Sequence, residues 1–172
     1  ATAIADTVGC WVRLYDEAVN ILWFQAVGDG VTDDVDSFNV AIDILTVLGG
    51  GVLFVPAKTF AVGNSNPGAV STYDRWAIKF STGNDNIEIR GAKGSKIFLL
   101  AAANAVTIMI GKLTSTYESV HNIKISGLEI DGNRTNQDAP LDTTKHYAGI
   151  QVCHNSTRII LEDLYIHDCQ YY

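Results

Sequence analysis

The sequence predicts an all-β protein built as a parallel β-helix, with three strands per coil and an N-terminal capping α-helix. Two observations predict this fold. Short stretches of alternating apolar and polar residues recur in a 36-residue register in the C-terminal half, and internal repeats of this kind are typical of a solenoid. One amphipathic helix precedes the repeats. A helix in that place would cover the apolar, unpaired end that a β-helix leaves open.

Residues 1–22 are expected to form a lead-in segment. The stretch Trp11–Tyr15 alternates apolar and polar residues, as a half-buried strand does. Val19, Ile21 and Trp23 continue at the same period, so we expect a second strand that leads into the next turn.

Residues 23–62 are assigned to the N-terminal cap, which comprises a turn, the helix and the first strands. Gly28 and Gly30 give the turn its backbone freedom, and Thr32, Asp33 and Asp34 are expected to cap the first amides of the helix. A triple glycine should end the helix, and two short strands should follow it. The predicted buried stripe of the helix comprises Val35, Phe38, Ile42, Leu45 and Leu48.

Residues 63–172 are assigned to the coils. A shift of 36 residues superimposes the alternating positions of 122–132 on those of 158–168, and the reverse shift reaches 86–91. A further strand precedes each unit, at 77–80, 106–110 and 149–152. A β-sandwich would also show alternation, but it gives no reason for a fixed register. The third unit ends at Tyr172 without a second cap, so we expect a truncated coil series. The matched pairs are Ile123 with Ile159, Ile125 with Leu161, Leu128 with Leu164, and Ile130 with Ile166.

Composition excludes several classes of function. The formal net charge of −7 and the pI of about 4.9 argue against nucleic acid binding. No apolar run approaches the roughly 18 residues of a membrane span, so no membrane insertion is expected. The N-terminus lacks both Met and a signal-peptide pattern, which indicates a processed or partial chain. Cys10, Cys153 and Cys169 show no zinc-site spacing. They are expected to be reduced, with a Cys153–Cys169 contact between adjacent turns left open.

The motif GDGVTDD at 28–34, followed by the helix, GGG at 49–51 and VPA at 55–57, resembles the pectate-lyase superfamily of right-handed parallel β-helices. Within it, the pattern is similar to the N-terminal part of phage tailspikes. The resemblance implies a homotrimer on a virion surface or otherwise outside the cell. Such a protein would bind a bacterial surface polysaccharide and depolymerise it as a glycoside hydrolase or a lyase. It also implies that the reaction centre lies on later coils, beyond Tyr172.

The candidate substrate-binding residues are Asp131, Arg134, Lys145 and His146, in a segment rich in acids and cations. Polysaccharide lyases and uronate epimerases need a cation for the uronate carboxylate, a base and an acid. In alginate epimerases a similar DGNR segment precedes a loop lysine, and by that resemblance Lys145 is the candidate cation. The alternative is structural: Asp-Gly-Asn is ordinary turn chemistry at a coil corner, and the loop cations are solvated.

Other acids offer weaker candidates, and the catalytic residues stay unassigned. Asp33 and Asp34 are explained by capping. Asp131 and Asp168 lie at almost equivalent places on successive coils, and neighbouring coils are about 4.8 Å apart. The two acids therefore form either a glycoside-hydrolase carboxylate pair or an outward acid ladder. Asp131, Asp163 and Asp168 could bind calcium, but no calcium motif supports them. No cofactor is expected.

Three functions follow. The first is the N-terminal part of a trimeric tailspike-like polysaccharide depolymerase. The second is a secreted polysaccharide lyase or uronate epimerase. The third is a non-enzymatic glycan-binding or structural solenoid.

Overall fold

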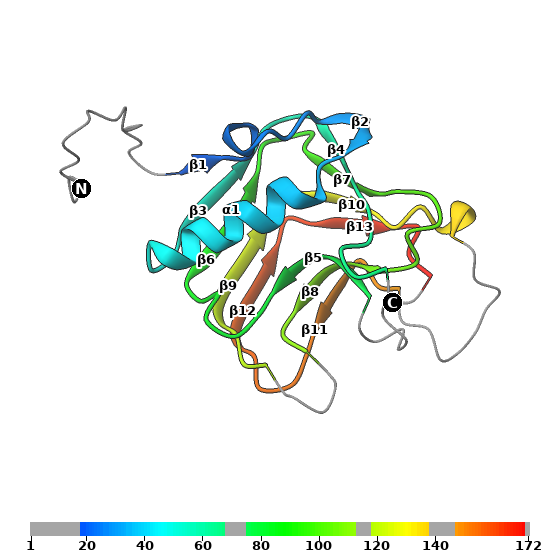
Figure 1. Ribbon diagram of the computed structural model, residues 1–172. Helices are drawn as coiled ribbons and strands as arrows, with labels where there is room; N and C mark the ends of the chain where they lie inside the picture. The colour runs from blue at the N-terminus through cyan, green and yellow to red at the C-terminus, as the bar shows by residue number, and fades with distance from the viewer. Residues whose placement is uncertain (1–17, 68–74, 113–117, 138–146, 171–172) are drawn as a thin grey trace.

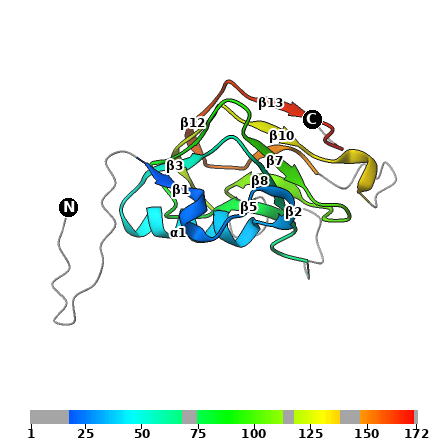
Figure 2. The ribbon, with the colours of Figure 1, turned by 90° about the horizontal axis from the view of Figure 1, so that it is seen from above.

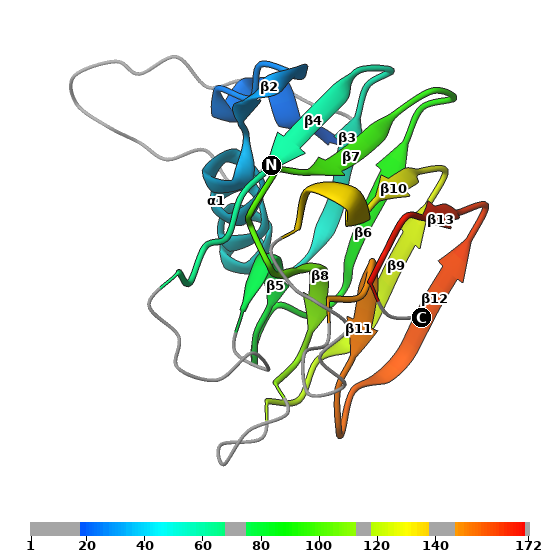
Figure 3. The same cartoon turned by 90° about the vertical axis from the view of Figure 1, so that its right-hand side faces the viewer.

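The computed structural model describes residues 18–67, 75–112, 118–137 and 147–170. Three parallel sheets wind around one apolar core, and a single α-helix lies across one end of the stack (Figure 1). Figures 2 and 3 show the same stack from above and from the side, with the helix at one end and the last strands at the other. The predicted all-β right-handed parallel β-helix with an N-terminal capping helix is confirmed.

Successive coils add strands to the three sheets, and among the described residues the first two sheets have five strands each and the third has three. The first sheet contains β1 (Val19–Asn20), β3 (Gly51–Val55), β6 (Ile87–Gly91), β9 (His121–Ser126) and β12 (Thr157–Glu162). The second sheet contains β2 (Asp29–Asp33), β4 (Thr59–Val62), β7 (Lys96–Leu99), β10 (Glu129–Asp131) and β13 (Tyr165–His167). The third sheet contains β5 (Trp76–Phe80), β8 (Val106–Ile110) and β11 (Ile150–Val152).

The strand register confirms the 36-residue repeat. Ile123 pairs with Ile159 in the first sheet, and Ile130 pairs with Ile166 in the second. Because the side chains of a strand alternate between its two faces, residues that pair in this register point to the same face. The apolar ones therefore stack inward from coil to coil. Leu53, Ile89 and Ile125 are accordingly buried completely in the core.

The corner between the first and second sheets depends on glycine. Gly127 has φ +68°, a conformation that costs glycine little. A Cβ at Gly91 would overlap the carbonyl oxygen of Gly127 on the next coil, so the two corner backbones approach more closely than other residues allow. Asp163 takes the equivalent corner of the last coil with φ +51°.

The capping helix α1 (Val35–Val47) buries one face against the first coil. Phe38 is completely buried and meets Phe60 of β4 edge to face, with ring centroids 5.8 Å apart. The predicted stripe is wrong at Leu48, which lies at the C-cap and is 55% exposed. Ala41 is buried instead. Within the described residues, no helix has both the length and the apolar character of a membrane span.

The acids before α1 hold the preceding loop more than they cap the helix. The carboxylate of Asp34 accepts hydrogen bonds from the amides of Val27 (2.6 Å) and Gly28 (3.1 Å). Asp33 Oδ1 accepts from the Val35 amide at 3.1 Å, so the capping prediction holds for Asp33 and is wrong for Asp34. The prediction is also wrong for Thr32, whose hydroxyl donates to Asp29 at 2.8 Å. These contacts give the acids a structural role.

The second predicted lead-in strand is wrong beyond Asn20. Residues Ile21–Phe24 form a 3-10 helix, η1, because the Asn20 side chain accepts the Leu22 amide at 2.9 Å and so favours a helix start over a strand. Trp11–Tyr15 lies outside the described residues. The division of the chain at residues 22 and 62 stays a prediction, since the cap strands β2, β3 and β4 belong to the same sheets as the coils.

Candidate functional site

The structure places two of the four predicted site residues, and it does not bring them together. Asp131 ends β10 and is largely buried, and its Oδ1 accepts the Asn133 amide at 2.8 Å. Arg134 begins the short helix η3 (Arg134–Asn136) and is exposed. Lys145 and His146 lie outside the described residues. The Asp-Gly-Asn corner is therefore a structural turn, and Arg134 stands at its solvent side.

Asp131 belongs to a cluster that we call the charged ladder, which comprises Lys96, Glu129, Asp131, His167 and Asp168. Three adjacent strands supply it, because Glu129 pairs with Lys96 and Tyr165, and Asp131 pairs with Phe98 and His167. The Lys96 ammonium lies 2.7 Å from Asp131 Oδ2 and 3.0 Å from Glu129 Oε1. The ladder thus links three successive coils along the outer face of the second sheet.

His167 closes the ladder on the last described coil. Its Nε2 lies 3.1 Å from Glu129 Oε1, and its Nδ1 lies 2.8 Å from Asp168 Oδ2. The hydrogen bond to Asp168, followed by that to Glu129, raises the pKa of His167 against a smaller opposing effect of burial. The imidazole is therefore held between two carboxylates, and its protonated form is favoured.

Two acids of the ladder, Glu129 and Asp131, are biased toward the ionised state. The Lys96 hydrogen bond, and then that of His167, lowers the pKa of Glu129. Burial acts to raise the pKa of Asp131, but the Lys96 ammonium and the Asn133 amide together outweigh it, so the net shift is downward. Burial likewise acts to lower the pKa of Lys96, and its two carboxylate partners reverse the shift.

This pattern favours the outward ladder over a glycoside-hydrolase pair. The residue in register with Asp131 is His167, one position before Asp168. A general acid needs a raised pKa, whereas that of Asp131 is lowered. Lys96, whose charge holds Asp131, and Glu129, which shares that lysine, were not predicted from the sequence.

The ladder also resembles a metal site in part. Single ligand atoms of Glu129, Asp131 and His167 lie within 4.8 Å of one another. The Lys96 ammonium already contacts both carboxylates, however, and a divalent cation there would be repelled at short range. Calcium also needs six to eight oxygen ligands. The donor set therefore fits its own lysine better than a metal ion.

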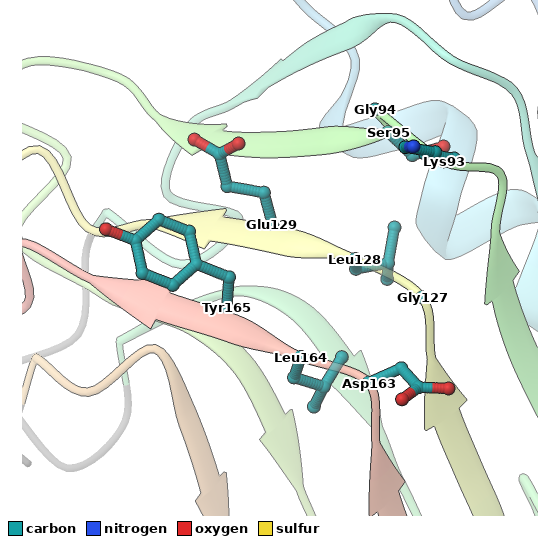
Figure 4. A pocket seen from close by; sticks show the side chains of 9 residues that line it. All are labelled: Lys93, Gly94, Ser95, Gly127, Leu128, Glu129, Asp163, Leu164 and Tyr165. Atoms are coloured by element: carbon teal, nitrogen blue, oxygen red, sulfur yellow. The ribbon is translucent and has the colours of Figure 1, made fainter.

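An open groove lies beside the ladder, where the first sheet turns into the second (Figure 4). Its volume is about 500 Å³. Figure 4 shows the Tyr165 ring and the Glu129 side chain over neighbouring strands, with Leu128 and Leu164 further along the same strands. The residues that line the groove are Lys93, Gly94, Ser95, Gly127, Leu128, Glu129, Asp163, Leu164 and Tyr165.

The outer face of the third sheet carries a second polar cluster that no sequence motif indicated. Lys79 pairs with Glu118 at 2.9 Å and lies 4.3 Å above the centre of the Trp76 ring. The buried hydroxyl of Thr107 on β8 has no hydrogen-bond partner in the part of the chain that the structure describes. Tyr147, which follows the segment 138–146 in the sequence, is buried shortly before β11 of this sheet. Cys153, at the end of the same sheet, is a buried free thiol like Cys169, and no disulfide joins them.

Comparisons with known proteins agree with this architecture, although no protein-family model matches the chain. The chain is 31% identical over 125 residues to mannuronan C5-epimerase AlgE1 of Azotobacter vinelandii, an alignment that covers 72% of the chain and 8% of AlgE1. It is 30% identical over 124 residues to alginate lyase 7 of the same organism, covering 72% of the chain and 14% of the lyase. The chain thus spans a small part of these relatives.

Solved structures with the same fold include an epimerase module, a surface adhesin and a phage protein. The A-module of A. vinelandii epimerase AlgE6 gives a TM-score of 0.67 at 22% identity, over 90% of this chain and 38% of that one. PfbA, a surface adhesin of Streptococcus pneumoniae, gives 0.64 at 19% identity, over 87% and 33%. Bacteriophage phi29 gene product 12 gives 0.60 at 22% identity, over 88% and 18%. The chain is therefore a right-handed parallel β-helix like the mannuronan C5-epimerase A-modules, the phage phi29 protein and PfbA.

Proposed function

We propose that this β-helix belongs to an extracellular protein that binds and modifies a polysaccharide, with a polyuronate as the substrate class. The observation that carries the proposal is the identity of 30–31% with a mannuronan C5-epimerase and an alginate lyase over 72% of the chain. Both names refer to enzymes of one polymer class. The likeness to phage and adhesin structures supports the fold alone.

The residues available on the chain suit the charge of such a substrate. Epimerisation and lyase cleavage both begin when a base removes the proton beside a uronate carboxylate, and a nearby cation stabilises the charge that develops. Arg134 is exposed shortly after β10 of the second sheet, and Lys145 and His146 follow it in the sequence, before β11. We assign Arg134 and Lys145 to substrate binding, and Asp131 to positioning the turn that carries Arg134.

A direct test is incubation of the protein with polymannuronate. Proton NMR would detect residues inverted at C5, and absorbance near 230 nm would detect unsaturated chain ends. We expect one of the two products, and we expect Arg134→Ala and Lys145→Ala each to weaken polymer binding while the far-UV circular dichroism stays unchanged. Absence of both products together with unchanged binding in both variants would contradict the proposal.

The resemblance of the GDGVTDD segment at 28–34 to phage tailspikes motivates a second candidate, a homotrimeric tailspike-like protein on a virion surface that depolymerises a bacterial surface polysaccharide. This candidate predicts a trimer in solution. Sedimentation equilibrium measures the mass directly, and a monomer at all concentrations would remove this candidate.

A third candidate is a glycan-binding solenoid without enzymatic activity, in line with the adhesin fold of PfbA. It predicts glycan binding with no change in glycan length or composition. Size-exclusion chromatography of the glycan after prolonged incubation separates it from the first two candidates.

A further inference from the structure

We infer that the groove between the first and second sheets is a binding subsite for an uncharged sugar unit, with the Tyr165 ring as its stacking platform. The inference rests on the proposed action on polysaccharides but goes beyond the proposed uronate contacts, because the sugar unit is uncharged. It concerns a different surface. The groove is lined by the segments 93–95, 127–129 and 163–165, whereas the proposed uronate contacts are Arg134 and Lys145.

The Tyr165 ring is exposed and yet held in place. Its side chain stands on the outer face of β13 and the residue is 64% exposed. One face of the ring stacks on the His167 imidazole, with centroids 4.6 Å apart and an interplanar angle of 25°. His167 is itself fixed by its contacts with Glu129 and Asp168. The charged ladder thereby orients an aromatic ring that would otherwise be free to rotate.

A fixed, exposed aromatic ring is suited to the apolar face of a sugar. Tyrosine offers a large apolar area together with a polar tip, and a ring that is already oriented loses little conformational entropy when a ligand stacks on it. An exposed aromatic side chain alone needs no explanation. An ordered aromatic side chain beside a groove, however, calls for a functional explanation.

The groove supplies the remaining parts of a small-ligand site. Its volume of about 500 Å³ lies within the roughly 300–1,000 Å³ typical of such sites. Leu128 and Leu164 give it an apolar lining, and the absence of a side chain at Gly94 leaves space above the backbone there. Hydroxyl groups of a sugar would meet Lys93, Glu129 and Asp163 at the rim. The Glu129 contacts among the described residues use Oε1, which leaves Oε2 to accept a hydroxyl.

The charge of the rim determines the class of sugar. Lys93 is the cation that lines the groove, against the carboxylates of Glu129 and Asp163. Asp131 and Asp168 stand close by on the ladder, where Lys96 and His167 offset part of their charge. A uronate would therefore meet net repulsion, whereas a neutral pyranose would find both donors and acceptors.

The test measures binding of four hexasaccharides by isothermal titration: cellohexaose, maltohexaose, mannohexaose and hexamannuronate. We expect at least one neutral hexasaccharide to bind with an affinity that is insensitive to salt. Tyr165→Ala should weaken that binding about tenfold, and Tyr165→Phe should largely retain it. Trp23→Ala is the matched control, because Trp23 is an aromatic residue, 40% exposed, in η1 next to β1 at the opposite end of the stack, and this variant should bind like the parent protein.

Two results would overturn the inference: no neutral hexasaccharide binds, or Tyr165→Ala binds as tightly as the parent. A tenfold loss in Trp23→Ala equal to that in Tyr165→Ala would also count against it. Circular dichroism and thermal melting confirm that each variant is folded. Conversion of polymannuronate by Tyr165→Ala would show that the proposed function stands even where the subsite fails, so the two failures are distinguishable.

Discussion

The inner and outer faces of the second sheet carry two ladders with the same strands and the same register. On the inner face, Ile97 and Ile130 stack within the apolar core. On the outer face, Lys96, Glu129 and His167 are joined by ion pairs and hydrogen bonds. The inner ladder tolerates any apolar residue of similar size, whereas the outer one depends on particular partners and on pH. The first determines the fold, and the second positions the surface groups.

The largest effect is expected in the apolar core, on the inner face of the first sheet. Ile125→Ala removes a completely buried side chain and should lower the free energy of unfolding by about 2–5 kcal/mol. Leu161→Ala is the matched control, because Leu161 pairs with Ile125 on the last described coil but is 43% exposed, and its cost should be clearly smaller. Urea denaturation followed by circular dichroism measures both. Equal losses would mean that burial does not set the stability of the stack.

The inner ladder could be predicted from the sequence, and the outer one only in part. Apolar alternation survives small changes in coil length, because any apolar residue in phase can fill the core. Which charged residues become partners, in contrast, depends on the actual strand register. A shift of 36 residues from Glu129 reaches Lys93, but the structure pairs Glu129 with Lys96, 33 residues earlier.

The reason lies in the corners of the coils. From the paired residues Arg90 and Ser126, five residues, 91–95, lead to β7, whereas two, 127–128, lead to β10. The longer corner moves Lys96 into the ladder and leaves Lys93 at the groove. A difference in loop length of this kind leaves the apolar pattern intact, so the sequence did not reveal which lysine meets Asp131. Asp131 itself was found because its corner motif is local.

An intermediate effect is expected when the cation of the outer ladder is removed. Lys96→Met leaves the largely buried Asp131 and its neighbour Glu129 without their ammonium partner, and should cost about 1–3 kcal/mol. Adding Asp131→Asn to Lys96→Met should recover part of this loss, since the uncompensated charge is then gone. Denaturant titration of the single and double variants measures the coupling. A double variant less stable than Lys96→Met would show that charge compensation is not the cause.

The outer ladder should also make stability depend on pH in two directions. The pKa values of Glu129 and Asp131 are lowered from 4.5 and 3.8, so their contribution is present above those values and is lost as the pH falls through the folded-state values. The pKa of His167 is raised from 6.5, so its contribution is complete below pH 6.5 and is lost as the pH rises through the folded-state value. The ladder should therefore stabilise most between about pH 5 and 6.5.

Thermal melting between pH 3 and 9 measures this profile. His167→Gln should flatten the alkaline side and leave the acid side in place, and Glu129→Gln should weaken the acid side. Leu161→Ala, which changes no charge, should shift the whole profile without changing its shape. A profile that is identical in His167→Gln and the parent protein would contradict the assignment.

The smallest effect is expected from the corresponding ladder on the first sheet. Lys124 lies 2.6 Å from Glu162 and 3.6 Å from Glu88, on strands that stack like those of the second sheet. Lys124 joins the strands on both sides of it, whereas both partners of Lys96 lie on β10. Lys124 and Glu162 are also more exposed than Lys96 and Asp131. Exposed ion pairs gain little in water and are screened by salt. Lys124→Met should therefore destabilise the protein less than Lys96→Met, and the difference from the parent should vanish in 1 M NaCl while that of Lys96→Met persists. If the two lysine variants respond equally to salt, the burial of Asp131 beside Lys96 does not distinguish the charged ladder from the ladder on the first sheet. The ordering of the Tyr165 ring would then need another cause.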